Sequence, residues 1–68
     1  MENQISFEQL TVSHDLEVRV VSPSRGLDVT GHVLHKNDNL AVLQHYVEVN
    51  GKQRRRAAIV LPQDTIYV

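Results

Sequence analysis

The hydrophobic positions along the chain fall into five short segments rich in Val, Ile, Leu and Thr. The segment at residues 16–21 alternates apolar and polar side chains, which is the two-residue period of a half-buried β-strand. Clusters of turn-forming residues separate the segments. The predicted strands cover residues 16–21, 27–36, 40–49, 53–61 and 65–68, and the turn clusters cover residues 22–26, 37–39, 50–51 and 62–64. This pattern predicts an all-β protein.

The Asn50-Gly51 pair is the clearest local signal in the sequence. Both central residues of a type I′ turn need a positive φ angle, which Asn and Gly tolerate. A two-residue turn at this point sets Val49 opposite Lys52 and, further from the turn, His45 opposite Arg56. The sequence therefore predicts a hairpin between residues 40–49 and 53–61 with a fixed register.

A second tight turn at Asp38-Asn39 predicts the preceding hairpin. Its register sets Lys36 opposite Ala41 and His32 opposite His45. Alternation along the three strands then separates a core face from a mixed face. The predicted core face carries Leu27, Val29, Val33, Leu40, Val42, Tyr46, Ala57, Ile59 and Leu61. The predicted mixed face carries Asp28, Thr30, His32, Lys36, Ala41, His45, Arg54 and Arg56, together with Leu34, Leu43 and Val47.

Two further features shape the predicted fold. Gly31 interrupts the second predicted strand, and a lone Gly in a strand often marks a bend or a close approach of two backbones. Ahead of the strands, Ser6 is suited to cap a short helical turn with Phe7 and Leu10 on one face, and an extended lead-in is the alternative. We therefore predict one domain over residues 1–68, a small, strongly bent antiparallel barrel of five strands with a short N-terminal helix.

Length and composition limit the classes of protein that fit. The chain has 68 residues, enough for one small domain that buries only about 60% of its unfolded surface. Assembly with further copies is therefore an expected source of stability. The absence of cysteine excludes disulfides and thiolate metal sites. The first residues are polar and acidic, and no apolar run approaches the roughly 20 residues of a membrane span, so we expect a soluble, cytoplasmic protein.

The three consecutive arginines at residues 54–56 admit two interpretations. In the first, they form the solvated end of an edge strand, where long cationic side chains prevent pairing with a wrong chain. In the second, they form a binding site for nucleic acid. A net charge of −1 requires any such site to be a local patch, because bulk attraction is absent. Guanidinium groups bind phosphate bidentately and stack on bases, but aromatic platforms for stacking are scarce in this chain. The candidate nucleic-acid-binding residues on the mixed face are Arg54, Arg56, Lys36, His32 and His45.

The four histidines raise the question of a metal site. In the predicted register, the Cβ atoms of His32 and His45 lie about 5 Å apart, but structural zinc usually takes four ligands. The carboxylates are scattered over turns and termini, and the chain has no nucleophile elbow, phosphate-binding loop or Cys-His pair. We therefore expect no metal, no cofactor and no enzymatic activity.

The strand pattern resembles that of the Sm-like (Lsm/Hfq) small barrels over residues 6–68. One matching stretch is VTGHVLHKNDNLAVL at residues 29–43, with Glu48 beyond it, and the other is AAIVLPQDTIYV at residues 57–68. The resemblance implies a bent five-stranded barrel related to SH3-like folds, and RNA binding by loops at the pore of a ring. By this resemblance the loop positions are Asn37, Asp38, Asn39, Gln63 and Asp64, which adds Asn37 and Asn39 to the candidate RNA-binding residues.

The chain also departs from the Sm-like pattern. The turn after Gly31 is shorter, and residues 61–64 (LPQD) replace the Arg-Gly or Lys-His pair that many members carry in the last loop. In Sm rings the fourth strand pairs with the fifth strand of the neighbouring subunit. The resemblance therefore implies self-association through the edges at residues 57–61 and 65–68.

Three functional interpretations remain open at this point. The first is an RNA-binding protein. The second is a protein-binding regulator of a larger cytosolic machine, of phage or mobile-element origin, because the layout is also similar to the Rof-type inhibitors, Sm-like monomers that bind the Rho termination factor. Near-neutral charge and acidic loops favour this second interpretation. The third is a stand-alone barrel whose recognition site is not visible in the sequence.

Overall fold

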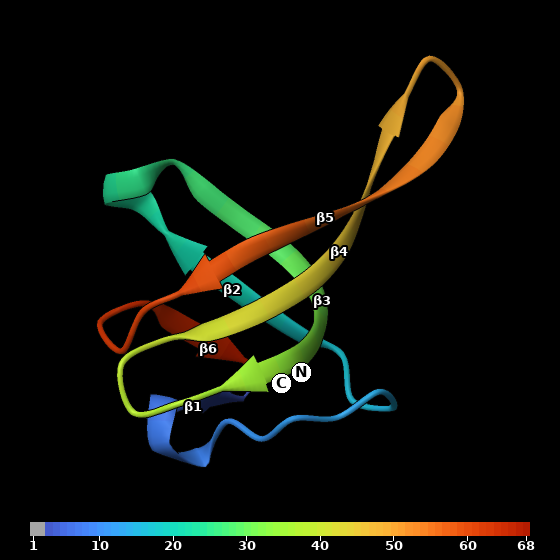
Figure 1. Ribbon diagram of the computed structural model, residues 1–68. Coiled ribbons are helices and arrows are strands. Elements are labelled where there is room, and N and C mark those ends of the chain that lie inside the picture. Colours follow the sequence, from blue (N-terminus) through green and yellow to red (C-terminus); the bar gives the residue numbers. More distant parts are fainter. Residues whose placement is uncertain (1–2) are drawn as a thin grey trace.

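A computed structural model describes residues 3–68 and shows an all-β protein, as predicted (Figure 1). The predicted segments form strands close to their expected bounds, and two short 3₁₀ turns join them. The strands are β1 (Gln4–Ile5), β2 (Val18–Ser22), β3 (Leu27–Lys36), β4 (Ala41–Val49), β5 (Lys52–Val60) and β6 (Thr65–Tyr67). The 3₁₀ turns are η1 (Phe7–Gln9) and η2 (Pro23–Arg25).

The sheet has six strands and is open, which corrects the prediction of a five-stranded barrel. All described pairings are antiparallel, and the strand order is β1-β6-β2-β3-β4-β5. The additional strand is β1, whose Ile5 lies opposite Ile66 of β6. A two-residue strand has no periodicity of its own, so the sequence pattern could not reveal it. In the sheet that the structure describes, β1 and β5 are the two edges.

Strand β3 belongs to both halves of the sheet because it bends. Its first half, through Gly31, pairs with β2, and its second half, from His32, pairs with β4. At the change-over the backbones of β3 and β4 approach closely, since a Cβ atom on Gly31 would lie 2.0 Å from the carbonyl oxygen of Gln44. The expected bend and close approach at Gly31 are therefore confirmed.

A β-bulge in β3 inverts the predicted faces of β4 and β5. The pairing shifts between Val33 and His35, so that Val33 lies opposite Leu43 rather than Gln44. A one-residue slip sends every side chain of a strand to the other face. The register between β4 and β5 was predicted correctly, so both strands change face together. Residues Ala41, Leu43, Ala58 and Val60 are buried, whereas Tyr46, Ala57 and Ile59, placed in the core by the sequence, are exposed.

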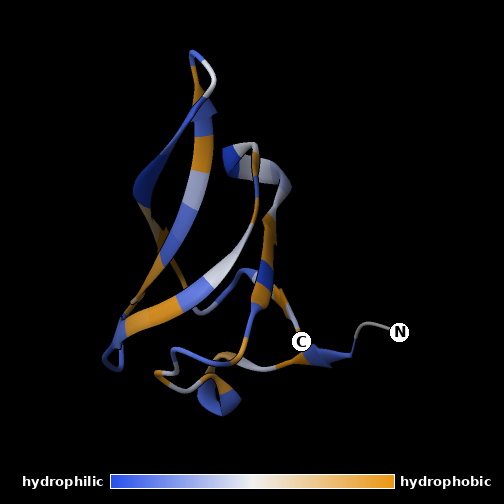
Figure 2. Ribbon diagram, turned by 90° about the vertical axis from the view of Figure 1, so that its right-hand side faces the viewer, coloured by the Kyte–Doolittle hydropathy of each residue, from blue (hydrophilic) through white to orange (hydrophobic). Residues whose placement is uncertain are grey.

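The core lies between the two halves of the bent sheet, and η1 covers one end of it. The backbone N–H of Ser6 donates to the side-chain oxygen of Gln9 (2.9 Å), which fixes this turn and buries Phe7 and Leu10. The expected helical turn is thus a single 3₁₀ turn. The core side chains are Phe7, Leu10, Val18, Val20, Val33, Ala41, Leu43, Ala58, Val60 and Ile66. Figure 2 shows hydrophobic segments on the strands of the body, whereas hydrophilic segments predominate toward the tip of the β4–β5 hairpin.

Two ion pairs between residues of the described range 3–68 hold the sheet outside this core. The guanidinium of Arg19 on β2 donates twice to the Asp28 carboxylate on β3, at 3.0 and 2.8 Å, and these hydrogen bonds hold the pKa of Asp28 below its ordinary value. The second pair joins Arg25 of η2 to the buried Asp64 in the turn before β6. This pair ties the ends of β2, β5 and β6 together, because Arg25 also donates to the carbonyl of Ile59 (3.0 Å).

Candidate functional site

The hairpin of β4 and β5 projects from the body of the protein as a two-stranded arm (Figure 1). Its tip is the predicted Asn50-Gly51 turn, with φ angles of 52° and 76°. This left-handed backbone at both positions is what the type I′ turn requires. We call residues 44–57 the arm. Every residue from Glu48 to Ala57 is exposed, so the body covers neither face of the outer half of the arm.

The arm concentrates the positive charge of the chain. Four of the seven Lys and Arg residues lie on it, against one carboxylate, Glu48. The arm therefore carries a charge of +3 within a protein of net charge −1. Within residues 3–68, none of these four cations takes part in an ion pair or a hydrogen bond. The four are Lys52, Arg54, Arg55 and Arg56.

The register distributes these cations over both faces of the arm. Arg54 lies opposite Val47 and Arg56 opposite His45, so the two arginines share one face with Lys52. Arg55 lies opposite Tyr46 on the other face. The prediction that Arg54 and Arg56 stand side by side, with Arg55 turned away, is confirmed.

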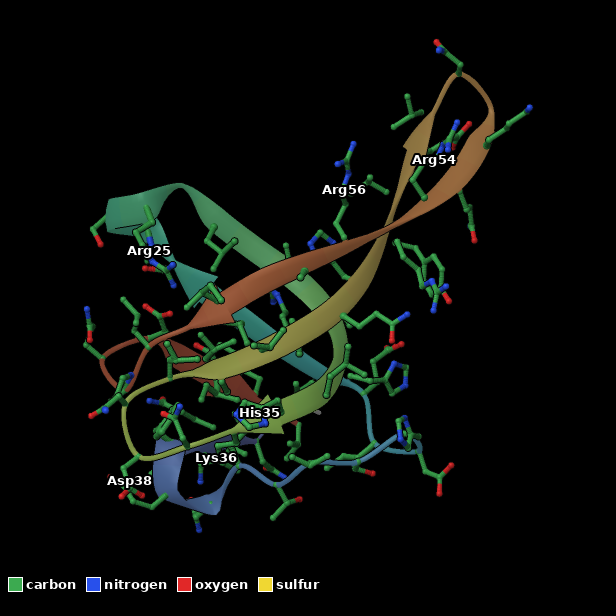
Figure 3. All side chains as sticks on the ribbon, in the orientation of Figure 1. Arg25, His35, Lys36, Asp38, Arg54 and Arg56 are labelled. Carbon is green, nitrogen blue, oxygen red and sulfur yellow. The ribbon has the colours of Figure 1, made fainter. Side chains whose placement is uncertain are left out.

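The other predicted site residues are not all brought together with the arginines. Figure 3 shows Lys36 in the lower part of the body and Arg54 and Arg56 on the arm. The Lys36 ammonium lies 4.9 Å from the centre of the Phe7 ring and donates to the backbone carbonyl of Glu8 (3.3 Å). Lys36 therefore fastens η1 to β3 and borders a separate hollow of ≈ 240 Å³. Lys36 lies opposite Ala41 as predicted, which puts it on the same face of the sheet as Arg56 but at the opposite end of β4 from the arm. Lys36 therefore shares the predicted face but forms no single basic patch with the arginines.

The two asparagines of the β3–β4 loop also have a structural role. The side-chain oxygen of Asn37 accepts hydrogen bonds from the backbone N–H groups of Asn39 (2.7 Å) and Leu40 (2.9 Å). Such a side-chain bond to the following backbone is what makes Asn favourable in turns. Asn37 and Asn39 lie at the far end of β4 from the arm, so they do not extend the arginine surface.

The predicted pairing of two histidines is wrong. His32 lies opposite Gln44, and His45 lies opposite Arg56, so the two imidazoles occupy opposite faces of the sheet. The cause is again the bulge at Leu34, which the sequence pattern did not show. In residues 3–68, no three His, Cys, Asp or Glu side chains are arranged to hold a metal ion.

The last loop differs from the expectation that the resemblance gave. Asp64, a ligand-loop position by the resemblance, is buried, and one of its carboxylate oxygens accepts from Arg25 and from the backbone N–H of Leu61 (2.9 Å). Its other oxygen has no partner among the described residues. Gln63 remains exposed. The carboxylate therefore closes the turn before β6 and is turned away from solvent.

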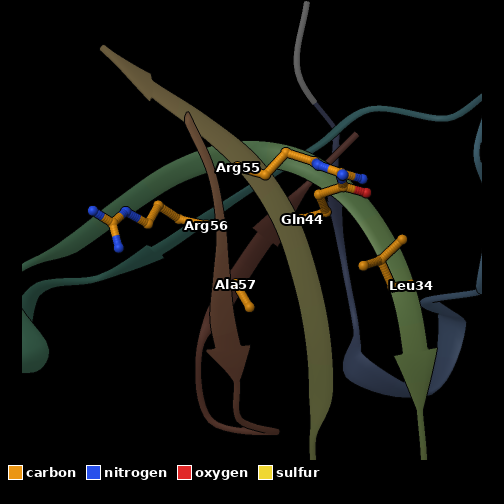
Figure 4. Close-up of a pocket in the computed structure, with 5 residues that line it drawn as sticks. All are labelled: Leu34, Gln44, Arg55, Arg56 and Ala57. Carbon is orange, nitrogen blue, oxygen red and sulfur yellow. The ribbon is translucent and has the colours of Figure 1, made fainter. Parts of the chain in front are cut away.

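A shallow groove of ≈ 270 Å³ runs across the outer face of the sheet at the base of the arm (Figure 4). Its lining residues are Leu34, Gln44, Arg55, Arg56 and Ala57. The Arg55 side chain extends across β4 toward Gln44, whereas the Arg56 side chain points to the other side of the sheet. Sequence reasoning missed this groove because it placed Ala57 in the core. Leu34, 40% exposed at the bulge, is the hydrophobic wall of the groove.

Only one of the two edges predicted for self-association is open. Residues Thr65–Tyr67 of β6 pair with β2 on one side and with β1 on the other. The backbone of Val68 continues this pairing, exchanging two hydrogen bonds with Asn3. The edge expected at residues 65–68 is therefore already occupied, and in the described sheet β5 alone offers the predicted pairing edge.

Comparison of the chain with protein-family models, with curated proteins and with solved structures finds no match. The arm, the groove and the two edges are therefore interpreted from their own geometry. No helical segment in residues 3–68 has the length and hydropathy that spanning a membrane requires.

Proposed function

We propose that the protein is a non-enzymatic, cytoplasmic nucleic-acid-binding protein and that the cations of the arm hold the phosphate backbone. The observation that carries this proposal is the segregation of charge, because an acidic protein presents four unengaged cations on one projecting hairpin. Phosphate contacts supply most of the affinity of non-specific nucleic-acid binding. RNA, the ligand implied by the Sm-like resemblance, falls within this proposal because the contacts are with phosphate. As part of this proposal, we also infer that the bent sheet is related to the Sm-like or SH3-like folds.

The three Lys and Arg residues outside the arm differ from those of the arm, and this difference supports the proposed role of the arm. Arg19 is bound to Asp28, Arg25 to Asp64, and Lys36 to the backbone of η1. Each of these three groups already has a structural partner. The arm is therefore the part of the described chain where cations remain available for a ligand.

The proposal is tested by fluorescence anisotropy with a labelled single-stranded RNA, titrated with the full chain at several salt concentrations. We expect the affinity to fall steeply as salt rises, with a slope of about 0.7 per phosphate contact on logarithmic axes. The double variant Arg54→Ala/Arg56→Ala should reduce this slope by about two contacts and lose most of the binding. Lys36→Ala, which removes one charge from the body, is the matched control. Binding that the double variant leaves unchanged would refute the proposal.

A second candidate function is the regulation of another protein by direct contact. It is supported by the edge of β5, which pairs with no second strand in the described sheet although Arg25 donates to its Ile59 carbonyl, and by the groove at the base of the arm. An extended segment of a partner can add a strand to such an edge. Ile59, 42% exposed on β5, would lie at this contact. Ile59→Lys should then abolish binding of the partner at any salt concentration and leave nucleic-acid binding intact. Self-association through the same edge is measured directly as the solution mass of the wild-type chain.

A further inference from the structure

The arm has the shape of a two-stranded β-ribbon that stands clear of the body. Its outer part, residues 45–50 and the strand paired with them, extends about 17 Å at 3.4 Å per residue. Every residue from Glu48 to Ala57 is exposed, so both faces are open at the tip, whereas His45 and Val47 nearer the body are half-buried. A ligand can therefore contact the ribbon from two sides at once.

The distribution of charge matches such a two-sided contact. A protein that lies flat on an extended polyanion gains from cations on the contact face alone. Here Arg54 and Arg56 point from one face and Arg55 from the other, at adjacent positions of one strand. A polyanion that lies on both sides of a thin ribbon brings phosphates within reach of the cations on both of its faces.

We infer that the arm enters the major groove of double-stranded, B-form DNA. This groove is about 12 Å wide and about 8.5 Å deep, it admits a two-stranded β-ribbon, and its two walls are lined with phosphates. The inference rests on the proposed function, because it names the form of nucleic acid that the arm binds. In this arrangement Arg54 and Arg56 contact the phosphates of one wall, and Arg55 contacts those of the other.

Two observations argue for DNA duplexes over the alternatives. Tyr46 is the one Phe, Tyr or Trp residue in the arm, whereas proteins that hold single strands stack successive bases on several aromatic rings. The major groove of A-form RNA is too deep and narrow for side chains to enter. At the tip, the Asn50 and Gln53 side chains carry amides, which are suited to hydrogen bonds with base edges.

The test compares four labelled oligonucleotides of equal length and corresponding sequence at one fixed salt concentration: duplex DNA, single-stranded DNA, duplex RNA and single-stranded RNA. Anisotropy titrations with the full chain should show duplex DNA bound about tenfold or more tighter than the other three. Single substitutions then distinguish a contact with one face of the arm from a contact with both faces. Arg55→Gln and Arg54→Gln should each weaken duplex binding by a similar factor, whereas Lys36→Gln should leave it unchanged.

The outcomes separate the inference from the proposal on which it rests. If none of the four oligonucleotides binds, the proposed function itself fails. If they bind, but single strands or duplex RNA bind as tightly as duplex DNA, groove insertion is overturned and phosphate binding stands. The same holds if Arg55→Gln is silent while Arg54→Gln weakens binding. Circular dichroism of each variant confirms that the sheet is intact.

Discussion

Substitution of Gly31 by alanine tests the close approach on which the bent sheet depends. The added Cβ atom would lie 2.0 Å from the carbonyl oxygen of Gln44, where contacts under 3.0 Å essentially do not occur, so the two backbones must separate by about 1 Å. Overpacking of a core costs about 1–3 kcal/mol, and we expect the upper end because the obstacle is backbone. The reduced entropy of the unfolded chain offsets about 0.5–1 kcal/mol. The net loss is then about 2 kcal/mol, or roughly 8–16 °C in Tm for a domain of this size.

The measurement is urea unfolding followed by far-ultraviolet circular dichroism, which reports the β-sheet. Gly26→Ala is the matched control, because its Cβ atom meets nothing within 4 Å and its φ of 63° is the sole source of strain. A left-handed alanine costs about 1–2 kcal/mol. If Gly31→Ala were no more destabilising than a conservative exposed substitution such as Ala57→Ser, the backbones would not be in contact and the explanation of the bend would fail.

Three further outcomes are expected. Leu43→Ala should lower the free energy of unfolding by about 2–5 kcal/mol and Leu34→Ala by less than about 1 kcal/mol, because Leu43 is fully buried and Leu34 is 40% exposed; equal losses would contradict the inverted faces of β4. Arg25→Gln should cost about 3 kcal/mol in urea unfolding, because it leaves the buried Asp64 carboxylate without its cation, and the lower end of the usual range is expected since the Arg25 side chain is 34% exposed. A loss no larger than that of the exposed variant Arg55→Gln would refute this role. Since the pKa of Asp28 is lowered in the folded state, its contribution is complete above the unfolded pKa of about 4 and is lost as pH falls through the folded value. The urea midpoint of Asp28→Asn should therefore drop less than that of the wild type between about pH 5 and pH 2, and identical drops would show that this carboxylate is not involved.

Local signals in the sequence were sufficient for strands β2 to β6 and for the turn at the tip of the arm. Asn50 and Gly51 adopt the predicted left-handed backbone, and the register that follows from them is correct at every pair from Val49 to His45. These features depend on residues that are neighbours in the chain, so steric preference at two positions determines them.

The errors arose where distant segments decide the outcome. The bulge at Leu34 depends on the pairing between β3 and β4. No sequence pattern near Leu34 predicts it. It inverted the faces of two strands, which placed Ile59 in the core and hid the groove at the base of the arm. The burial of Asp64 likewise depends on Arg25, 39 positions earlier in the chain. The arginines remained correct candidates because their exposure on the hairpin follows from the turn alone.

The strand order has a consequence for how the molecule folds. Strands β2 to β5 form a meander of neighbouring hairpins, whereas Ile5 and Ile66 pair across 61 positions of sequence. Closing so long a loop has a high entropic cost, and the contacts that offset this cost form only once the meander is in place. The pairing of β1 with β6 should therefore form last and open first in native-state hydrogen exchange. Because β6 is the sole neighbour of β1 in the described sheet, local opening of β6 would also release β1.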